Sequence, residues 1–238
     1  MNLNNTVNPV KTACIFGAAP VGNVSHLIPQ NSFIIAADGG VNAVNRLGLH
    51  PDLTLGDFDS LGYVPDTENV ERHPVEKDDT DMGLAVKKAL SLGYNRLFLF
   101  GGMGGERPDH TLSNLQTVVY AAKNGANTFL TDGKNCFTAV SEGTKMIFPE
   151  NYNGNFSVFS AEGKAEGVSL SGLKYTVENA TLSGDFPLGV SNSFPDTSTD
   201  ICGKSPQNAE VSVKKGTLWI CFQCENRSES EFPIRQNL

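Results

Sequence analysis

Apolar and polar residues follow two different patterns in the first half of the chain. Short apolar runs predict strands at residues 12–16, 33–37, 52–55, 96–100 and 127–131. Between them, apolar residues recur at helical spacing, which predicts helices at residues 41–47, 80–92 and 110–123. Strands that alternate with helices are typical of an α/β fold, here a mostly parallel, Rossmann-like sheet with flanking helices.

From about Ser141 the chain changes to short segments in which apolar and polar residues alternate. These segments predict strands at residues 156–160, 164–170, 210–213 and 217–222. Such a series, separated by Gly, Asn, Asp and Pro, is typical of an antiparallel β-sandwich. We therefore predict an α/β domain over residues 1–140 and a β-sandwich domain over residues 141–238. The polar tail from residue 225 to 238 is expected to be loosely ordered.

Charge and composition narrow the classes of function. The 238 residues carry a formal net charge of −8 and contain no run of Lys or Arg, which argues against nucleic acid and anionic membranes as partners. No stretch is long and apolar enough to span a bilayer, and residues 1–10 lack the features of a secretory signal. The five cysteines are scattered, as expected of reduced thiols in the cytoplasm. Cys221 and Cys224 form a CxxC without a second pair, so a redox or zinc role is disfavoured.

Four acidic clusters in glycine-rich or turn-like settings lie between residues 38 and 110. Their sequences are ADGG at 37–40, GDFDS at 56–60, DDTD at 78–81 and RPDH at 107–110. Three of them follow predicted strands, so they should gather at the carboxyl edge of the sheet, where α/β folds bind ligands. Carboxylates that meet there repel one another unless a cation is bound, and oxygen ligands favour Mg²⁺.

Each cluster also has a simpler interpretation. Asp57 and Asp59 flank one aromatic residue and can reach a single ion from a turn, although one of them could merely cap the turn. Asp38, taken alone, is better explained as the N-cap of the helix that begins at Val41. One acid of the DDTD cluster is expected to cap the following helix or to interact favourably with its dipole, but three acids in four residues exceed that need.

The remaining motif residues are suited to phosphate. Lys77 precedes the DDTD cluster and could pair with phosphate oxygens or simply offset the local negative charge. The glycines from Gly101 to Gly105 allow close approach of backbone to a ligand, but they lack the ending of a Walker loop. Arg107 offers a two-pronged contact for phosphate, and Asp109 a carboxylate for a metal or substrate. A surface arginine beside a helix-capping aspartate explains this pair equally well.

Taken together, ADGG, GDFDS, a TD that opens a helix, GGxGG and RxDH resemble the thiamine pyrophosphokinase (thiamine diphosphokinase) family. The resemblance extends through the β part, because GLKY at 172–175 is similar to the family's GLKY/W motif and Ser191-Asn192 to its SN motif. It covers roughly residues 12–223. One departure is Lys77, where animal members have Gln.

The resemblance implies transfer of a diphosphoryl group from ATP to the hydroxyl of thiamine, with release of AMP. It implies an ATP- and Mg²⁺-binding α/β domain, a thiamine-binding and dimerising β-sandwich, and a homodimer with active sites between subunits. The implied residues fall into overlapping sets: catalytic, Asp38, Asp57, Asp59, Asp81 and Asp109; metal-binding, Asp57, Asp59 and Asp81; phosphate-binding, Lys77, Thr80, Gly101, Gly102 and Arg107; thiamine-binding, Asp81, Ser191 and Asn192.

Two alternatives come from other classes of function. Asp57-Phe58-Asp59 is a DxD that could hold the metal of a glycosyltransferase, although ADGG and RxDH would then be unexplained. In a non-catalytic nucleotide-binding module, the acids would only cap helices. The roles of Tyr175 and Trp219 stay open, because an aromatic residue in a β run is more often part of the core.

Overall fold

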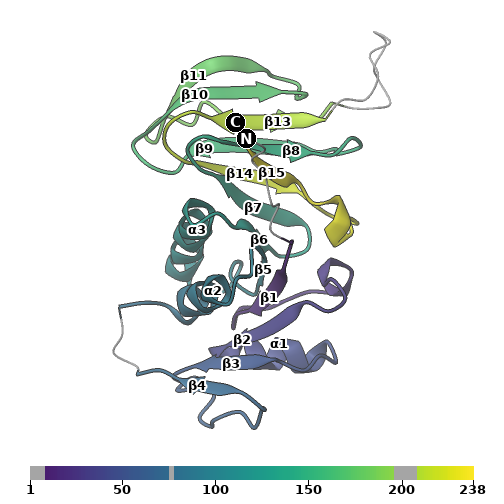
Figure 1. The fold of residues 1–238 in the computed structure, drawn as a ribbon, viewed down its shortest axis with the longest axis vertical. Coiled ribbons are helices and arrows are strands. Elements are labelled where there is room, and N and C mark those ends of the chain that lie inside the picture. The colour runs from purple at the N-terminus through teal and green to yellow at the C-terminus, as the bar shows by residue number, and fades with distance from the viewer. Residues whose placement is uncertain (1–8, 75–77, 196–207) are drawn as a thin grey trace, which may run out of the picture.

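The computed structural model describes residues 9–74, 78–195 and 208–238, whose strands form two sheets (Figure 1). Six neighbouring strands of the larger sheet are parallel, in the spatial order β6-β5-β1-β2-β3-β4. They are β1 (Thr12–Phe16), β2 (Phe33–Ala37), β3 (Leu53–Gly56), β4 (Val70–Arg72), β5 (Arg96–Phe100) and β6 (Asn127–Thr131). The predicted parallel α/β sheet is therefore confirmed.

The larger sheet continues beyond β6 with four antiparallel strands, in the order β7-β14-β9-β12. These are β7 (Asn135–Val140), β14 (Leu218–Gln223), β9 (Asn155–Ser160) and β12 (Asn192–Ser193). A separate antiparallel sheet has the order β11-β10-β13-β8-β15. Its strands are β11 (Val177–Ser183), β10 (Lys164–Ser171), β13 (Ala209–Val213), β8 (Thr144–Phe148) and β15 (Ile234–Asn237). The predicted antiparallel part is confirmed as well.

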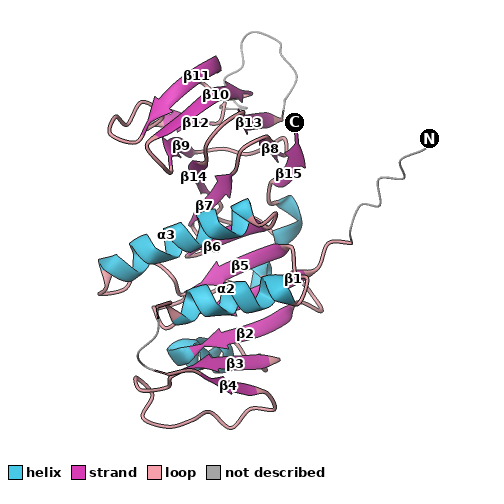
Figure 2. Cartoon of the chain, turned by 60° about the vertical axis from the view of Figure 1, so that its left-hand side comes forward, coloured by secondary structure: helices cyan, strands magenta, loops and turns pink. Residues whose placement is uncertain are grey.

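Helices cover both faces of the parallel strands (Figure 2). The helix α1 (Val41–Arg46) packs against the same core as Phe16 and Phe100, whereas α2 (Asp81–Ser91) and α3 (Pro108–Lys123) pack on the opposite face with Ile15 and Leu99. Because adjacent residues of a strand point to opposite faces, one apolar run supplies both layers. The described residues also form three short 3₁₀ helices: η1 (Ser25–Leu27), η2 (Asp38–Gly40) and η3 (Glu229–Glu231).

One core passes from the α1 face of the parallel strands into the space between the two sheets. Phe98 and Phe129 contact Phe232, with ring centroids 5.2 Å and 4.9 Å apart, and Phe222 and Phe148 continue the series. Residues before and after the predicted boundary at 140 and 141 belong to the same larger sheet and to the same core. The division of the chain into domains at that point stays a prediction.

The expectation of a loosely ordered tail is wrong. Residues 234–237 form β15 against β8, and Phe232 is 1% exposed within the aromatic core. Arg235 donates hydrogen bonds to the carbonyl of Ala122 at 2.7 Å and to Oγ of Ser141 at 2.8 Å. The tail is thus fastened both to the end of α3 and to the smaller sheet. The polar side chains of the tail did not indicate this order, because the tail is held mainly by one buried phenylalanine and by backbone pairing with β8.

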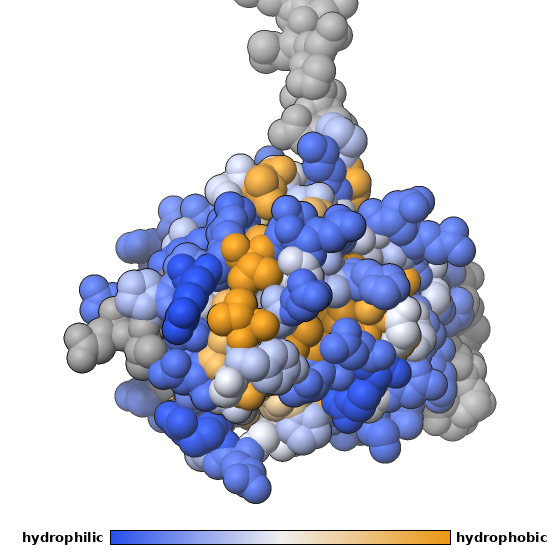
Figure 3. All heavy atoms as spheres, turned by 90° about the horizontal axis from the view of Figure 1, so that it is seen from below, coloured by the Kyte–Doolittle hydropathy of each residue, from blue (hydrophilic) through white to orange (hydrophobic). Residues whose placement is uncertain are grey.

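Helix and strand boundaries follow the sequence closely where apolar runs are long. Four predicted strands, 12–16, 33–37, 96–100 and 127–131, coincide with β1, β2, β5 and β6. The strands that were missed are β4, β7, β8, β11, β12 and β15. Of these, β4 and β12 have only three and two residues and β11 and β15 contain several exposed positions, whereas β7 and β8 are mostly buried or half-buried. Within the described ranges, no helix is long and apolar enough to cross a membrane. Seen from the β4 end, the surface is mostly hydrophilic around a small group of apolar side chains (Figure 3).

Candidate functional site

The loops that follow β1, β2, β3 and β5 meet at the carboxyl edge of the parallel strands. A side chain added at Gly17 would collide with the carbonyl of Gly101, and one added at Gly56 would lie 3.1 Å from Cα of Asp38. Gly101 has φ of 65° and packs on the backbone of Gly17, a conformation and a contact that favour glycine. The ADGG and GDFDS motifs are therefore neighbours in space, and the glycine-rich loop after β5 packs on the loop after β1.

Asp38 belongs to the loop after β2 and bonds to the loop after β3. Oγ of Ser60 donates a hydrogen bond of 2.5 Å to Oδ2 of Asp38. The N-cap interpretation of Asp38 does not hold, because the N-cap of α1 is Gly40 and makes no side-chain bond. Oδ1 of Asp38 is buried and has no hydrogen-bond partner within the described residues. A buried carboxylate oxygen without a donor is costly unless a cation or a ligand hydrogen reaches it.

The GDFDS motif is a turn built around a buried aromatic residue. Phe58 is 3% exposed and has a left-handed backbone with φ of 63°, which presents the two flanking aspartates on one loop. Oδ1 of Asp57 accepts a hydrogen bond of 3.1 Å from the backbone N–H of Asp59. Asp57 is partly buried and Asp59 is exposed. A strained conformation at a non-glycine residue is typical of functional loops, where the surrounding structure maintains it.

The fit of this edge to Mg²⁺ depends on how many carboxylates a magnesium ion needs. Across the described ranges, no three His, Cys, Asp or Glu side chains lie close enough together to hold a metal by themselves. Mg²⁺ usually keeps several waters and takes only one or two carboxylates together with substrate phosphates. The donors present are all oxygens, and Oδ1 of Asp38 is buried without a partner. The carboxylates at this edge are thus better suited to a Mg²⁺ ion that binds together with a nucleotide than to a permanently bound structural metal.

The start of α2 combines capping with an ion pair. Thr80 is the N-cap, and its hydroxyl accepts a hydrogen bond of 3.1 Å from the N–H of Gly83. Asp79 accepts from the N–H of Thr80 and pairs with Lys87 at 2.5 Å, so Asp79 is the structural acid of this cluster. Asp81 begins the helix. Lys77 lies outside the described residues.

The glycine-rich loop and the RxDH motif follow β5. The backbone carbonyl of Gly102 accepts a hydrogen bond of 2.7 Å from Nδ2 of Asn114, a buried residue of α3. Arg107 makes two hydrogen bonds to Asp109, at 3.0 Å and 2.6 Å, and both side chains are well exposed. The hydrogen bond from Arg107 lowers the pKa of Asp109 to about 2. Asp109 therefore holds the Arg107 guanidinium at the start of α3. A bound phosphate would either replace the carboxylate of Asp109 or share the guanidinium with it.

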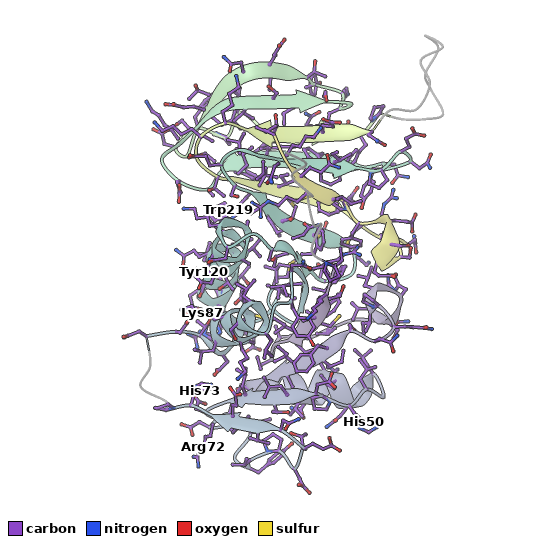
Figure 4. All side chains as sticks on the ribbon, viewed as in Figure 1. His50, Arg72, His73, Lys87, Tyr120 and Trp219 are labelled. Carbon is purple, nitrogen blue, oxygen red and sulfur yellow. The ribbon has the colours of Figure 1, made fainter. Side chains whose placement is uncertain are left out.

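A groove of about 560 Å³ lies between α2 and α3, next to the start of α2. Lys87 of α2 and Tyr120 of α3 line it, and the Lys87 ammonium lies 5.4 Å from the centroid of the Tyr120 ring. Figure 4 shows Lys87, Tyr120 and Trp219 along this side of the molecule. Trp219 is half-buried and donates a hydrogen bond of 3.2 Å to the carbonyl of Leu115, so it packs β14 against α3.

The SN motif lies in the β part and contacts the GLKY motif of the same chain. Asn192 is 6% exposed, and its side-chain oxygen accepts from the N–H of Tyr175 at 2.9 Å while its nitrogen donates to the carbonyl of Tyr175 at 2.8 Å. Ser191 is exposed and has φ of 63°. The two motifs, 17 residues apart, thus form one unit.

Sequence reasoning missed two contributors to the site. The loop from Gly17 to Pro20 packs against Gly101, and the N–H of Ala19 donates a hydrogen bond of 3.1 Å to the carbonyl of Gly101. Asn114 fixes the glycine loop from a buried position on α3. A glycine directly after a buried strand was the available signal for the first. A polar residue on the apolar face of a predicted helix was the signal for the second.

The CxxC motif does not form a reactive site. Cys224 is buried and Cys221 half-buried, and burial raises the pKa of both thiols, that of Cys224 to about 11. Reactive cysteines are exposed and have lowered pKa values. The disfavoured redox or zinc role therefore gains no support from the structure.

Two family models match the chain. The one described as "Thiamin pyrophosphokinase, catalytic domain" matches residues 24–130, and the one described as "Thiamin pyrophosphokinase, vitamin B1 binding domain" matches residues 145–218. The first match spans the acidic motifs, and the second spans GLKY and SN. Together they cover more than half of the chain.

Individual proteins and structures agree with these matches. The chain is 28% identical over 192 residues to Thiamin pyrophosphokinase 1 of Caenorhabditis elegans, covering 76% of this chain and 78% of that protein. It is 26% identical over 185 residues to the thiamine pyrophosphokinase of Bacillus subtilis (72% and 86% covered). The crystal structure of thiamine pyrophosphokinase from Bacillus subtilis superposes with a TM-score of 0.75 at 24% identity, covering 91% of this chain and all of that one. Thiamin pyrophosphokinase from Candida albicans gives 0.71 at 13% identity, covering 91% and 90%. At these identities the structures confirm the fold.

Proposed function

The chain belongs to the thiamin pyrophosphokinase family, and we propose from this premise that it transfers the diphosphoryl group of ATP to the hydroxyl of thiamine, releasing AMP. The observation that carries the proposal is the convergence of the ADGG and GDFDS loops at one sheet edge, joined by the bond between Ser60 and Asp38. Neither alternative function accounts for this convergence together with the match to both family domains.

Mg²⁺ is the cofactor of the proposed reaction. Asp57 and Asp59, with Asp81 from the start of α2, would hold the ion, and Asp38 would lie beside it. Bound Mg²⁺ would neutralise charge that accumulates on the phosphoryl oxygens of ATP. The carboxylates therefore bind the ion and orient the thiamine hydroxyl for attack at the β-phosphorus.

Phosphate binding is assigned to the loop after β5 and to the start of α2. The N–H groups of Gly101 and Gly102 lie in a loop whose conformation Asn114 fixes, and Arg107 stands at its end. Lys77 and Thr80 complete the assignment. Asp109 would hold the Arg107 fork in place until phosphate arrives, since a planar guanidinium binds phosphate through two parallel bonds.

Thiamine binding is assigned to Asp81 and to the SN motif at Ser191 and Asn192, which lies in the second family domain. The acids and the SN motif belong to different parts of the chain, and this supports a homodimer in which one subunit completes the site of the other. We further propose that the enzyme works in the cytoplasm and binds neither nucleic acid nor membranes, in keeping with its charge of −8.

Incubation of the purified protein with ATP, thiamine and Mg²⁺, followed by chromatography of both products, tests the proposal. Thiamine diphosphate and AMP should form in equal amounts, and chelation of Mg²⁺ should stop the reaction. Formation of ADP with thiamine monophosphate would contradict diphosphoryl transfer. Turnover of a nucleotide sugar in place of thiamine would favour the glycosyltransferase alternative.

A further inference from the structure

The strand β4 ends directly beside the GDFDS loop. It runs parallel to β3, with Gly56 opposite Arg72. The pairing continues one residue further, because the N–H of His73 donates a hydrogen bond of 2.9 Å to the carbonyl of Gly56. Since Gly56 immediately precedes Asp57, the backbone of His73 is fixed at the carboxyl edge of the sheet, next to the acidic loop.

The side chain of His73 points toward the layer that contains α2. In β4, Glu71 points to that layer, because its carboxylate pairs with the ammonium of Lys88 of α2 at 2.5 Å. Side chains alternate between the two faces of a strand, so the side chain of His73, two residues on, points to the same layer. Pro74 preserves the alternation, since the residue before a proline favours an extended backbone.

The start of α2 lies on the same side of the edge as His73. The helix runs away from the carboxyl edge, because Leu92, just after its end, lines a cavity with His50 at the amino edge. Going back from Lys88 to Asp81 therefore advances about 10 Å toward the carboxyl edge, and His73 lies about 7 Å beyond Glu71 in that direction. Figure 4 shows His73 on the side of the molecule that carries Lys87, and His50 on the other side.

The imidazole of His73 is available to a ligand. His73 is half-buried, and its side chain makes no hydrogen bond or ion pair with any other residue of the described ranges. Lys87 and Arg107, in contrast, are paired with Asp79 and Asp109. An imidazole N–H donates a hydrogen bond, whereas ionised carboxylates only accept. Phosphate oxygens are also acceptors, so His73 offers them a donor that the acidic loop lacks.

We propose that His73 binds the diphosphoryl part of ATP by donating a hydrogen bond from its imidazole to a phosphate oxygen. The inference rests on the proposed function, in which the thiamine hydroxyl attacks the β-phosphorus beside the carboxylates. In the sheet, β2 and β3 lie between β4 on one side and β1 and β5 on the other. The acidic loops are thus flanked by two phosphate contacts, one from the end of β4 and one from the loop after β5.

Steady-state kinetics test this contact. His73→Ala should raise KM for ATP about tenfold or more and leave KM for thiamine unchanged, because loss of a hydrogen bond to a charged group weakens binding by about that factor. His73→Gln, whose amide also donates a hydrogen bond, should return KM for ATP to within about threefold of the wild type. An unchanged KM for ATP in His73→Ala would overturn the proposal, as would an equal loss in both variants.

The matched control is His50→Ala. His50 also precedes a proline, Pro51, but it is exposed at the amino edge of the sheet, before β3. This variant should leave both KM values unchanged. A rise in KM for ATP equal to that of His73→Ala would overturn the proposal, because the effect would then not depend on the position of the imidazole.

Calorimetric binding of two nucleotides that do not react distinguishes failure of this inference from failure of the proposed function. The first is the ATP analogue with a methylene group between the α- and β-phosphates, which cannot release AMP, and the second is AMP. With Mg²⁺ present, His73→Ala should weaken binding of the analogue about tenfold and leave binding of AMP unchanged. Equal weakening of both would overturn the proposal, because a general distortion of the site affects both nucleotides.

The two failures give different results. If the wild-type protein forms no thiamine diphosphate and His73→Ala still weakens binding of the analogue alone, the proposed reaction fails and the contact of His73 with phosphate is supported. If thiamine diphosphate forms normally and the analogue binds equally well to His73→Ala, the contact is overturned and the proposed reaction stands.

Discussion

Ser60 donates a hydrogen bond of 2.5 Å to Asp38, and this bond joins two motifs that lie 22 residues apart in the chain. The ADGG and GDFDS loops follow adjacent parallel strands, β2 and β3, so both loops emerge at the same edge of the sheet. Carboxylates gathered at one edge weaken the fold unless hydrogen bonds or a cation offset their repulsion. Ser60 supplies one hydrogen bond, and the buried Oδ1 of Asp38 is left for a ligand.

The first prediction concerns the metal. Asp57→Asn and Asp59→Asn should each lower turnover by orders of magnitude at limiting Mg²⁺, because loss of a carboxylate weakens charge stabilisation on the phosphoryl group. Steady-state rates across a Mg²⁺ titration measure this. The control is Asp66→Asn, which removes an exposed carboxylate from the same loop. Near-wild-type activity in either variant would exclude that aspartate as a ligand.

The second prediction concerns the arginine fork. Arg107→Lys should already impair turnover, because an ammonium cannot reproduce the two parallel bonds of a guanidinium to phosphate. Arg46→Lys, at an exposed arginine of α1, is the control for the exchange itself. If Arg107→Ala keeps the kinetics of the wild type, the pair with Asp109 is only a surface ion pair.

The second prediction extends to the pKa of Asp109, which pairs with Arg107. The hydrogen bond from Arg107 lowers the pKa of Asp109 to about 2 from the usual value near 3.8. Arg107→Ala should therefore raise the pKa of Asp109, and carbon-detected NMR titration of the carboxyl group would show it. Since a lowered pKa means that the interaction is present above the usual pKa and is lost as pH falls toward 2, both charges persist at neutral pH. An unchanged pKa in Arg107→Ala would mean that the two side chains do not pair in solution.

The sequence predicted the parts of the fold that depend on long apolar runs. Strands β1, β2, β5 and β6 are buried on both faces at every position after the first, and each contains a run of two or more apolar residues, so the local sequence identified them. The segment Ile234–Asn237 has no such pattern, and it becomes a strand only because β8 offers a free edge. Pairing of that kind depends on tertiary structure and leaves little trace in local sequence.

The candidate site shows the same division between what local sequence encodes and what packing decides. Motifs at strand ends predicted that Asp38 and the GDFDS turn would lie together, because strand direction fixes where loops emerge. The SN motif also identified Asn192. The sequence of that motif could not reveal that the side-chain amide of Asn192 turns inward to the backbone of Tyr175. Side-chain direction in an irregular loop depends on the left-handed backbone at Ser191, which the residue type does not predict.

The third prediction tests the anchored tail. Phe232→Ala should lower the free energy of unfolding by about 3–5 kcal/mol, because it empties a position among Phe98, Phe129 and Phe222 in the core. Ile234→Ala, two residues further and 59% exposed, should change it by less than about 0.5 kcal/mol. Urea denaturation measures both. Equal small effects would restore the expectation of a loosely ordered tail.

The fourth prediction concerns stability in alkali. Burial raises the pKa of the Cys14 thiol from 9.0 to about 12. A raised pKa means that the stabilising neutral form is fully present below pH 9, and that stability is lost as pH rises toward 12. Each such group should steepen the fall in unfolding free energy by up to about 1.4 kcal/mol per pH unit. Cys14→Ala should flatten that slope, measured by denaturation between pH 9 and 11. An identical slope would mean that Cys14 ionises as readily in the folded protein as in the unfolded chain.

The last prediction concerns the assignment of one active site to two subunits. If the β part of one chain completes the acidic site of another, two impaired variants, Asp57→Asn and Asn192→Ala, should complement each other after mixing and subunit exchange. Half of the dimers formed at random are mixed, and one of the two sites in each mixed dimer contains neither substitution. Activity should therefore approach about a quarter of the wild-type value, which follows from two-fold symmetry. Native mass spectrometry would establish that mixed dimers have formed. Mixed dimers without recovered activity would show that Asp57 and Asn192 serve the same site from within one chain, and the SN motif would then have to reach the carboxyl edge of its own sheet.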